Sequence, residues 1–514
     1  MPERRAHVHV GRLDAPGDGW PERGNHVPAA PLGRTDAVRT VDLWPMRPCP
    51  FTWSRFPLSV KRSSQPMARP THKASLAVVF LTVMVDLLGF GLILPLIPVY
   101  AKELMVGFSR AQMGWALGLL MTCYSIMQLG FAPFWGRLSD RVGRRPILIL
   151  SLTGSTFFYA LFALATLWGS LFWMFLSRIG GGIAGATIPT AQAYIADVTP
   201  MDKRTRGMAL IGVAFGLGFT FGPLMGAVAL MGEGRAGASP WPGFTAAAFS
   251  AAALVLAVIK LRESLDPGRV VPARRRLDLR SLHDALTTPS IALLLAVLCL
   301  CNFSFSNFEA TLSLVLASFL GVGRGGREIL LAFAFVGMVQ TLVQGGVVRP
   351  LAAWLSEGTL CGIGATLAVA GYVMMATAAA PPPGVVAAVA AGQAVSLTTA
   401  ASQVVRLMVG AGCVVAGLGF VYPSLQSLIS RRSDPSKQGG VMGVASSLNS
   451  LARILGIMAA TQLYSLVSQT APFWTATGLM ASALGLVAIA IRAGEDWRPK
   501  PLEAVASQPL PVRE

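Results

Sequence analysis

The chain has 514 residues, of which 53% are hydrophobic and only 13% are charged. Soluble domains carry about 25% charged residues, so this composition argues against a soluble protein and favours a membrane protein. The formal net charge of +18 does not indicate nucleic-acid binding, because the basic residues cluster in short loops between apolar runs and no nucleic-acid-binding motif accompanies them. No catalytic triad, phosphate-binding loop or metal-ligand cluster is present, so we expect no enzyme activity, cofactor or metal.

The first 74 residues differ from the rest of the chain. Residues 1–74 are rich in Pro, Arg, His and Gly without sustained periodicity, which predicts disorder. No apolar stretch that could serve as a signal peptide precedes Ser75. The sequence from Met67, MARPTHKASLAVVFL, is a short basic lead into the first apolar run. The hypothesis is that Met67 is the true start of the protein and that residues 1–66 are not made.

Apolar runs long enough to cross a bilayer, which takes about 20 helical residues, recur through the remaining chain. Lipid-facing backbone must satisfy its hydrogen bonds internally, so we expect helices. The predicted fold is an all-α polytopic membrane protein with twelve transmembrane helices in two pseudo-symmetric six-helix halves. The predicted spans are 75–101, 111–134, 146–167, 170–197, 208–231 and 243–261, then 290–320, 328–348, 359–379, 404–430, 440–467 and 471–491.

These spans divide the chain into an N-terminal half (75–261), a basic central loop (262–289), a C-terminal half (290–491) and a tail (492–514). Basic residues are concentrated in alternate loops, including the central one. By the positive-inside rule this predicts a multi-pass protein of the cell inner (cytoplasmic) membrane with both termini in the cytoplasm.

A faint internal repeat supports two matched halves. LSD (138–140) parallels LSE (355–357), and IPTAQAYIA (188–196) parallels YPSLQSLIS (422–430), in the same order. This pattern is typical of parallel six-helix repeats. The two motifs of the second half lie further apart along the chain than the two motifs of the first half. This predicts an insertion near 381–403, which is interpreted as a periplasmic loop.

The decapeptide GRLSDRVGRR, Gly136–Arg145, lies between spans two and three. Gly136 and Gly143 permit a tight turn and close helix approach. Asp140 among arginines can form a breakable charged latch; the alternative is a basic loop that only sets topology. These residues match the signature loop of the major facilitator superfamily, and the chain resembles that superfamily.

The resemblance implies further roles at the same membrane face. Arg144, or Arg141, would pair with Asp197 at the end of span four in the outward-open state. Asp140 would face the start of span eleven, where the helix N-terminus carries partial positive charge. Arg145 completes the basic end of the motif.

Span five contains GLGFTFGPLMG, Gly216–Gly226. Small residues four apart allow close helix contact, and proline favours a kink. Gly218, Gly222, Pro223 and Gly226 resemble the antiporter signature of exporters in the superfamily. The alternative interpretation is ordinary packing between membrane helices.

Charged residues inside apolar spans are functional candidates, because burying a charge in a bilayer is costly. Asp86 in span one is the leading candidate for proton coupling and Glu309 in span seven the second, since all five histidines lie outside the spans. Burial favours the neutral form of a carboxyl group and a nearby arginine the charged form. The resemblance links Arg178 in span four to proton transfer. Asp86 beside Arg178 could therefore change its protonation state as access to water changes. A fixed Asp86–Arg178 ion pair is the alternative.

Polar and aromatic residues inside the spans are candidates for a central substrate cavity, although contacts between helices would explain each of them as well. They are Gln128, Gln192, Asn302, Phe303, Gln340, Asn449 and Arg453.

Over residues 75–262 the sequence resembles the tetracycline-resistance exporters, a branch of the twelve-helix drug/proton antiporters. Phe158 stands where that branch has an acidic residue, Gln340 where it has a histidine, and the second-half latch is reduced to PLAAWLSEG. The resemblance implies a monomeric, proton-coupled exporter of a small organic or drug-like compound. The alternatives are a proton-coupled importer of a metabolite and a transport-dead membrane sensor or scaffold.

Overall fold

The computed structural model describes residues 72–199, 204–231, 238–265, 283, 286–320, 326–380, 397–434 and 438–494. The chain divides into two compact units, Met1–Met67 and Ala68–Glu514. The first unit, and with it the predicted start at Met67, lies outside the described residues. The described part is built from helices without strands, and twelve of them are long and apolar enough to span a membrane. The all-α, twelve-helix prediction is confirmed.

Proline and glycine interrupt several helices of the first half. Pro95 and Pro98 lack the backbone N–H that a continuous helix needs, and the chain there forms a 3-10 turn between two helices. The fourth span is also two helices, separated at residues 185–187. The helices of this half are α1 (His72–Ile93), η1 (Leu94–Leu96), α2 (Ile97–Leu104), α3 (Arg110–Val142), α4 (Arg144–Leu167), α5 (Leu171–Ala184), α6 (Ile188–Val198), α7 (Arg204–Ala229) and α8 (Trp241–Lys260).

The second half begins after the central loop, most of which lies outside the described residues. Its eighth span contains a π-helical turn at two adjacent glycines, Gly345 and Gly346. Residues 381–396 of the predicted insertion are not described, whereas 397–403 form the start of a helix. The helices are α10 (Pro289–Leu320), α11 (Gly326–Leu342), η3 (Val343–Val348), α12 (Arg349–Leu351), α13 (Glu357–Ala378), α15 (Leu397–Arg432), α16 (Gln438–Leu466) and α17 (Ala471–Ala493).

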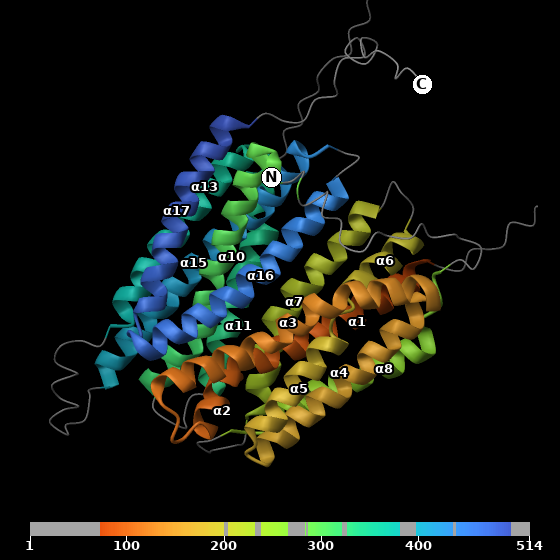
Figure 1. The fold of residues 1–514 in the computed structure, drawn as a ribbon, viewed down its shortest axis with the longest axis horizontal. Helices are drawn as coiled ribbons and strands as arrows, with labels where there is room; N and C mark the ends of the chain where they lie inside the picture. Colours follow the sequence, from red (N-terminus) through yellow and green to blue (C-terminus); the bar gives the residue numbers. More distant parts are fainter. Residues whose placement is uncertain are drawn as a thin grey trace, which may run out of the picture. The chain divides into compact units, whose positions relative to one another are not determined.

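The two halves repeat the same pattern of helix packing; the helices are labelled in Figure 1. In the first half α1 packs on α7 and α8, and α4 packs on α5 and α8. In the second half α10 packs on α16 and α17, and α13 packs on α15 and α17. Each of these four contacts of the first half thus has its counterpart six spans later. The halves meet where α3 packs on α16 and α7 on α11, which confirms the pseudo-symmetric arrangement.

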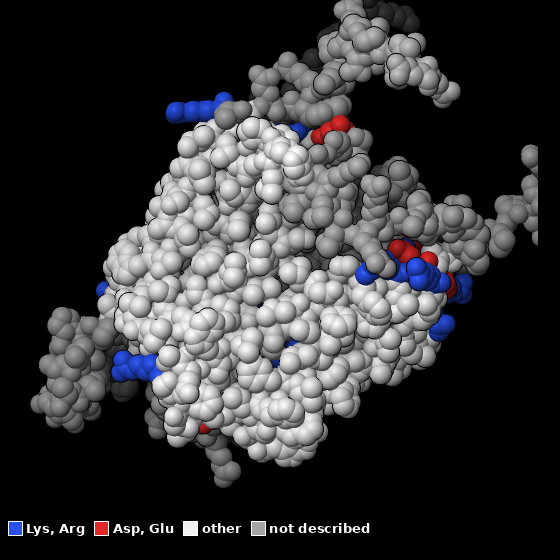
Figure 2. Space-filling view, in the orientation of Figure 1, with Lys and Arg blue, Asp and Glu red and all other residues white. Residues whose placement is uncertain are grey.

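The outer surface suits lipid. Large apolar side chains such as Phe157, Phe172 and Ile259 are more than half exposed. Figure 2 shows a broad face that is almost free of charged side chains, with Lys, Arg, Asp and Glu gathered near its margins. In water such a surface would be unfavourable, whereas in a bilayer it is solvated by acyl chains.

Candidate functional site

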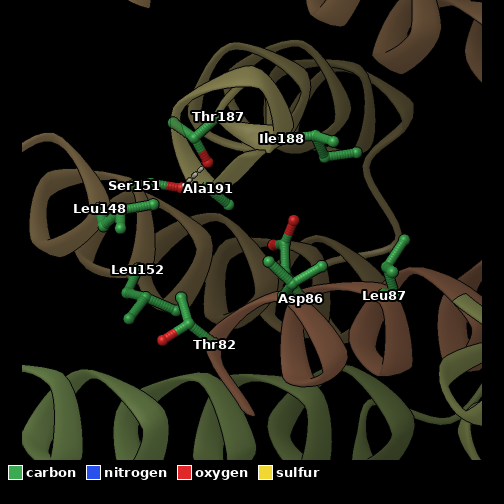
Figure 3. Close-up of a pocket in the computed structure, with 10 residues that line it drawn as sticks. Thr82, Asp86, Leu87, Leu148, Ser151, Leu152, Thr187, Ile188 and Ala191 are labelled. Atoms are coloured by element: carbon green, nitrogen blue, oxygen red, sulfur yellow. Dashed lines mark hydrogen bonds between the residues drawn. The ribbon is translucent and has the colours of Figure 1, made fainter. Parts of the chain in front are cut away.

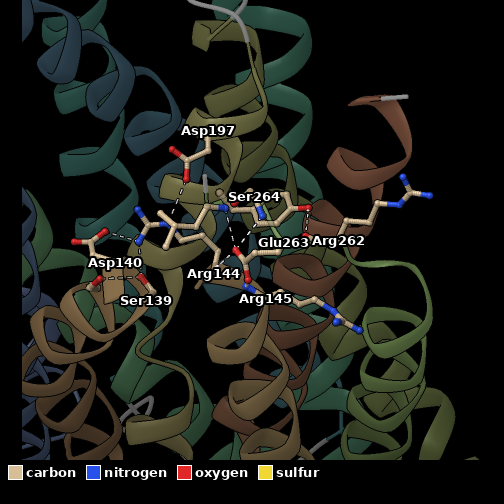
Figure 4. A network of polar contacts seen from close by, with 11 residues as sticks. Ser139, Asp140, Arg144, Arg145, Asp197, Arg262, Glu263 and Ser264 are labelled. Atoms are coloured by element: carbon tan, nitrogen blue, oxygen red, sulfur yellow. Dashed lines mark hydrogen bonds and ion pairs between the residues drawn. The ribbon is translucent and has the colours of Figure 1, made fainter. Parts of the chain in front are cut away.

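Arg144 is the centre of the charged latch that the signature loop predicts (Figure 4). It begins α4 directly after Gly143, whose φ of +112° is rarely adopted by residues with a side chain. Its guanidinium is buried and lies 2.5 Å from Asp140 and 3.3 Å from Asp197. Arg141 is exposed and makes no ion pair with a described residue. The structure therefore brings Asp140, Arg144 and Asp197 together and leaves Arg141 outside this cluster.

Glu263, which the sequence did not single out, holds the start of α4. Its carboxylate accepts hydrogen bonds from the backbone N–H groups of Arg144 (2.9 Å) and Arg145 (3.1 Å). The first N–H groups of a helix have no partner within it, so a carboxylate there is stabilising. A methyl group on Gly143 would lie 2.5 Å from Glu263 Oε2. Gly143 is thus required by space as well as by backbone conformation.

The second half has a related ion pair with its charges exchanged. Glu357 begins α13, the counterpart of α4, and pairs with Arg431 at the end of α15 over 2.8 Å. In the first half the base, Arg144, begins the helix and the acid, Asp197, ends its neighbour. The second-half pair is more exposed, with side chains 50% and 30% accessible. The sequence motif does not reveal this pair, because the acidic and basic residues have exchanged positions.

Asp86 is held by the third span. Its Oδ1 accepts a hydrogen bond from Ser155 Oγ (2.9 Å), and its backbone carbonyl accepts one from Tyr159 (3.1 Å). Asp86 makes no ion pair with a described residue, so the fixed Asp86–Arg178 ion pair, which was the alternative interpretation, is not formed. Figure 3 shows its carboxylate directed into a small pocket between α1, α4 and α6. Polar side chains in that pocket are Thr82, Ser151 and Thr187.

Arg178 and Arg453 instead both contact the ring of Phe90. The Cζ atom of Arg178 lies 4.6 Å from the ring centre of Tyr124 and 5.7 Å from that of Phe90. Arg453 Cζ lies 5.2 Å from the same Phe90 ring, and its Nη2 is 2.9 Å from Glu309 Oε1. Cations are attracted to the faces of aromatic rings. Arg178 belongs to the first half and Arg453 and Glu309 to the second, so both halves contribute to this charged centre.

Glycines allow α5 to bring Arg178 to this place. In the sequence RIGGGIAGA, a methyl group on Gly182 would lie 2.4 Å from the Tyr124 carbonyl oxygen, and one on Gly185 would lie 2.3 Å from the Tyr124 hydroxyl. The α5 backbone can approach α3 this closely only without side chains. Pro189 then stands in the first turn of α6, where proline is tolerated.

An aromatic pocket lies between the halves beside the charged centre. It contains Glu309 and Gln340, two of the predicted residues, together with Pro223 of the antiporter motif. Its walls come from α1, η1, α7, α10 and α11. The lining residues are Gly91, Leu94, Pro95, Phe219, Pro223, Phe305, Phe308, Glu309, Phe333, Val336, Gly337 and Gln340.

The other predicted cavity residues mostly connect helices. Gln128 donates to a backbone carbonyl at the break between α5 and α6 (3.2 Å). Asn302 donates to Asn449 over 2.5 Å and joins α10 to α16. Phe303 does not line the aromatic pocket, and Gln192 is exposed.

The antiporter motif packs α7 against α1. A methyl group on Gly218 or Gly222 would lie 2.7 or 2.6 Å from atoms of α1, and one on Gly226 would lie 3.0 Å from a side chain of α11. Pro223 lines the aromatic pocket. The motif therefore stands where the first half meets both the pocket and the second half.

Helix α3 packs closely on α16 towards the end of α3 that lies opposite the signature loop. There a methyl group on Gly118 would lie 2.5 Å from Thr461 Oγ1, and one on Gly114 would lie 3.0 Å from Gln462. At the signature-loop end, a methyl group on Gly136 of α3 or on Gly443 of α16 would meet nothing within 4 Å. The two helices are thus tightly packed at Gly114 and Gly118, whereas Gly136 and Gly443 have open space beside them.

Two matched six-helix halves that enclose buried charges and a pocket between them define a multi-pass membrane transporter. The chain belongs to the Major Facilitator Superfamily, whose sequence profile matches residues 79–408 and 384–514. It is 30% identical to tetracycline resistance protein, class D, of Salmonella ordonez over 76% of this chain and 89% of that protein. It is 31% identical to major facilitator superfamily domain-containing protein 10 of Homo sapiens over 80% of this chain and 92% of that protein.

The crystal structure of the human organic anion transporter MFSD10 (TETRAN) has a fold similar to that of this protein. It has a TM-score of 0.53 and 26% identity, and the match covers 82% of this chain and all of that one. The similarity to several tetracycline resistance proteins confirms the resemblance to the tetracycline-exporter branch. The protein is a transporter of small molecules in the inner membrane and not an enzyme.

Proposed function

We propose that the protein exports a small organic compound in exchange for protons, and that Asp86 carries the coupled proton. The supporting observation is the position of Asp86, a carboxyl group in the first span that faces a small polar pocket and has Ser155 rather than an arginine as its partner. A carboxyl group without a fixed cationic partner can gain and lose a proton as its access to water changes.

The transport cycle follows from the two halves, residues 75–261 and 290–491, which move as units of a monomer. Rocking about the central pocket exposes it to one side of the membrane at a time. With both termini in the cytoplasm, the signature loop lies on the cytoplasmic side and the α3–α16 contact at Gly118 closes the outer side. Arg144 is paired with Asp197 in this arrangement, whose outer side is closed, whereas the resemblance implied that pair for the outward-open state.

Export rather than import is supported by the motif Gly218–Gly226 and by relatives named as tetracycline resistance proteins. An importer of a metabolite would use the same fold with the opposite direction of proton-driven flux. A sensor or scaffold would carry nothing.

A growth experiment tests the proposal and finds a substrate. Cells with and without the gene are grown on a panel of antibiotics, dyes and aromatic acids, each with and without a protonophore. The gene should protect against some compounds, and the protonophore should remove that protection. Asp86→Asn should insert normally but give no protection, whereas the matched control Glu328→Gln, which changes an exposed carboxylate of α11, should protect like the wild type. Normal protection by Asp86→Asn would reject Asp86 as the proton carrier.

A further inference from the structure

Arg178 has a buried guanidinium whose donors lack acceptors among the described residues. The residue is 2% exposed, and its Nε and Nη2 atoms are both buried without a hydrogen-bond partner. These two nitrogens form one edge of the guanidinium plane, the edge that can bind a carboxylate through two parallel hydrogen bonds. Buried charged donors without acceptors are costly. An acceptor supplied by a ligand would remove that cost.

A second guanidinium lies over the same ring. Arg453 contacts the Phe90 ring from the other half, and its Nε is also buried without a partner. The one carboxylate here that pairs with an arginine, Glu309, is bonded to Arg453, whereas Asp86 is bonded to Ser155. Two cations on one ring repel each other in a low-dielectric interior unless an anion lies close to both. The charge of Arg178 is therefore uncompensated by any carboxylate of the described residues.

We propose that the transported compound is an aromatic carboxylate, or a similarly planar anion, whose charged group binds Arg178 and Arg453 at Phe90. Its apolar body contacts Phe219, Phe305 and Phe308, which must move apart to widen the small adjoining pocket when the compound binds. Glu309 lines that pocket and holds Arg453, so it competes with the ligand for this arginine. The inference rests on the proposed function, because it names the substrate class of the same central site.

Matched probes test the charge requirement. The purified full-length protein is titrated with a panel of aromatic carboxylates, with the primary amide of each, and with the corresponding ammonium compounds. Carboxylates should bind at least about tenfold more tightly than their amides, because a hydrogen bond to a charged group contributes that much. Equal binding of acid and amide, preference for the ammonium compounds, or no carboxylate binding at millimolar concentration across the panel would overturn the inference.

Two variants separate recognition from folding. Arg178→Lys keeps the charge but loses the planar two-donor edge, so it should reduce the acid-over-amide preference severalfold while amide binding is retained. Glu309→Gln removes the internal competitor and should tighten carboxylate binding severalfold, a gain that a misfolded protein would not show. An unchanged acid-over-amide ratio in Arg178→Lys, or weaker carboxylate binding by Glu309→Gln, would contradict the inference.

Asp86→Asn distinguishes this inference from the proposed function. It should keep the acid-over-amide preference, which the arginines provide, but lose proton-driven export. Selective carboxylate binding without any proton-driven flux in the wild type would support the anion site and reject the proposed transport mechanism. Proton-driven flux of uncharged compounds with no preference for acids would support the proposed transport mechanism and reject the anion site.

Discussion

Arg178 of the first half and Arg453 of the second half contact the ring of the same residue, Phe90, at 5.7 and 5.2 Å from its centre. Phe90 lies one helical turn after Asp86 in α1. One short segment of the first span therefore carries both the proposed proton site and the ring that joins the charged groups of the two halves. A change at this ring should affect substrate binding without removing the proton carrier.

Replacing Phe90 by leucine should weaken binding of the transported anion by about tenfold, because each cation–ring contact contributes about 0.5–2 kcal/mol. Phe90→Tyr keeps the ring and should bind nearly normally. Equilibrium binding to the purified variants measures the effect. Phe157→Leu, a change at a lipid-exposed ring, is the control. Equal affinity of Phe90→Leu and the wild type would show that the ring does not position the arginines.

Breaking the first-half latch should cost more than breaking the second-half pair. Asp197→Asn removes one of two acidic partners of a buried guanidinium, whereas Glu357→Gln affects a pair that water screens. We expect Asp197→Asn to lower the rate of transport about tenfold or more and Glu357→Gln to change it less than twofold. Initial transport rates at equal protein amounts make the comparison. Equal losses would mean that burial of the latch is unimportant.

Alanine should be tolerated at one glycine of the signature loop and not at the other. Gly143→Ala places a methyl group against Glu263 at a backbone conformation that is strained by about 1–3 kcal/mol for residues other than glycine. Gly136→Ala meets open space inside a helix. The midpoint of thermal unfolding in detergent should fall for Gly143→Ala and remain unchanged for Gly136→Ala. A similar midpoint for both would contradict the role of Glu263 at the start of α4.

Two glycines of α7 give a corresponding test of the antiporter motif. A methyl group on Gly222 would lie 2.6 Å from the Leu88 carbonyl oxygen, whereas one on Gly212 would meet nothing within 4 Å. Overpacking of this kind costs about 1–3 kcal/mol. Gly222→Ala should therefore separate α7 from α1 and lower both stability and transport, and Gly212→Ala should do neither. Thermal unfolding and transport are measured for both variants. Equal stability and equal transport of Gly222→Ala and Gly212→Ala would refute the packing role of Gly222.

The architecture could be predicted from the sequence, because the length and composition of apolar runs determine which segments can span a bilayer. The repeated motifs also predicted two matched halves, since they kept the same order along the chain. The first latch was predictable from a family motif that places Asp140 and Arg144 four residues apart.

Contacts between distant helices were not predictable in the same way. Asp86 and Arg178 were expected to interact because both are charged and buried, but Ser155 and Tyr124 are closer partners, and nothing in the linear sequence ranks these distances. The capping of α4 by Glu263 depends on how α8 ends beside α4. The reversed Glu357–Arg431 pair shows that a motif search detects residue identity rather than complementary charge.

Flux in proteoliposomes is the most direct test of proton-driven export. A compound identified by the growth experiment is added outside vesicles containing the protein, and a pH gradient, acidic inside, is imposed. Transporters inserted with their cytoplasmic side outward should accumulate the compound in exchange for protons, and Asp86→Asn should show no accumulation driven by the gradient. Accumulation only when the gradient is reversed would show import, and gradient-driven accumulation by Asp86→Asn would contradict the central role of Asp86.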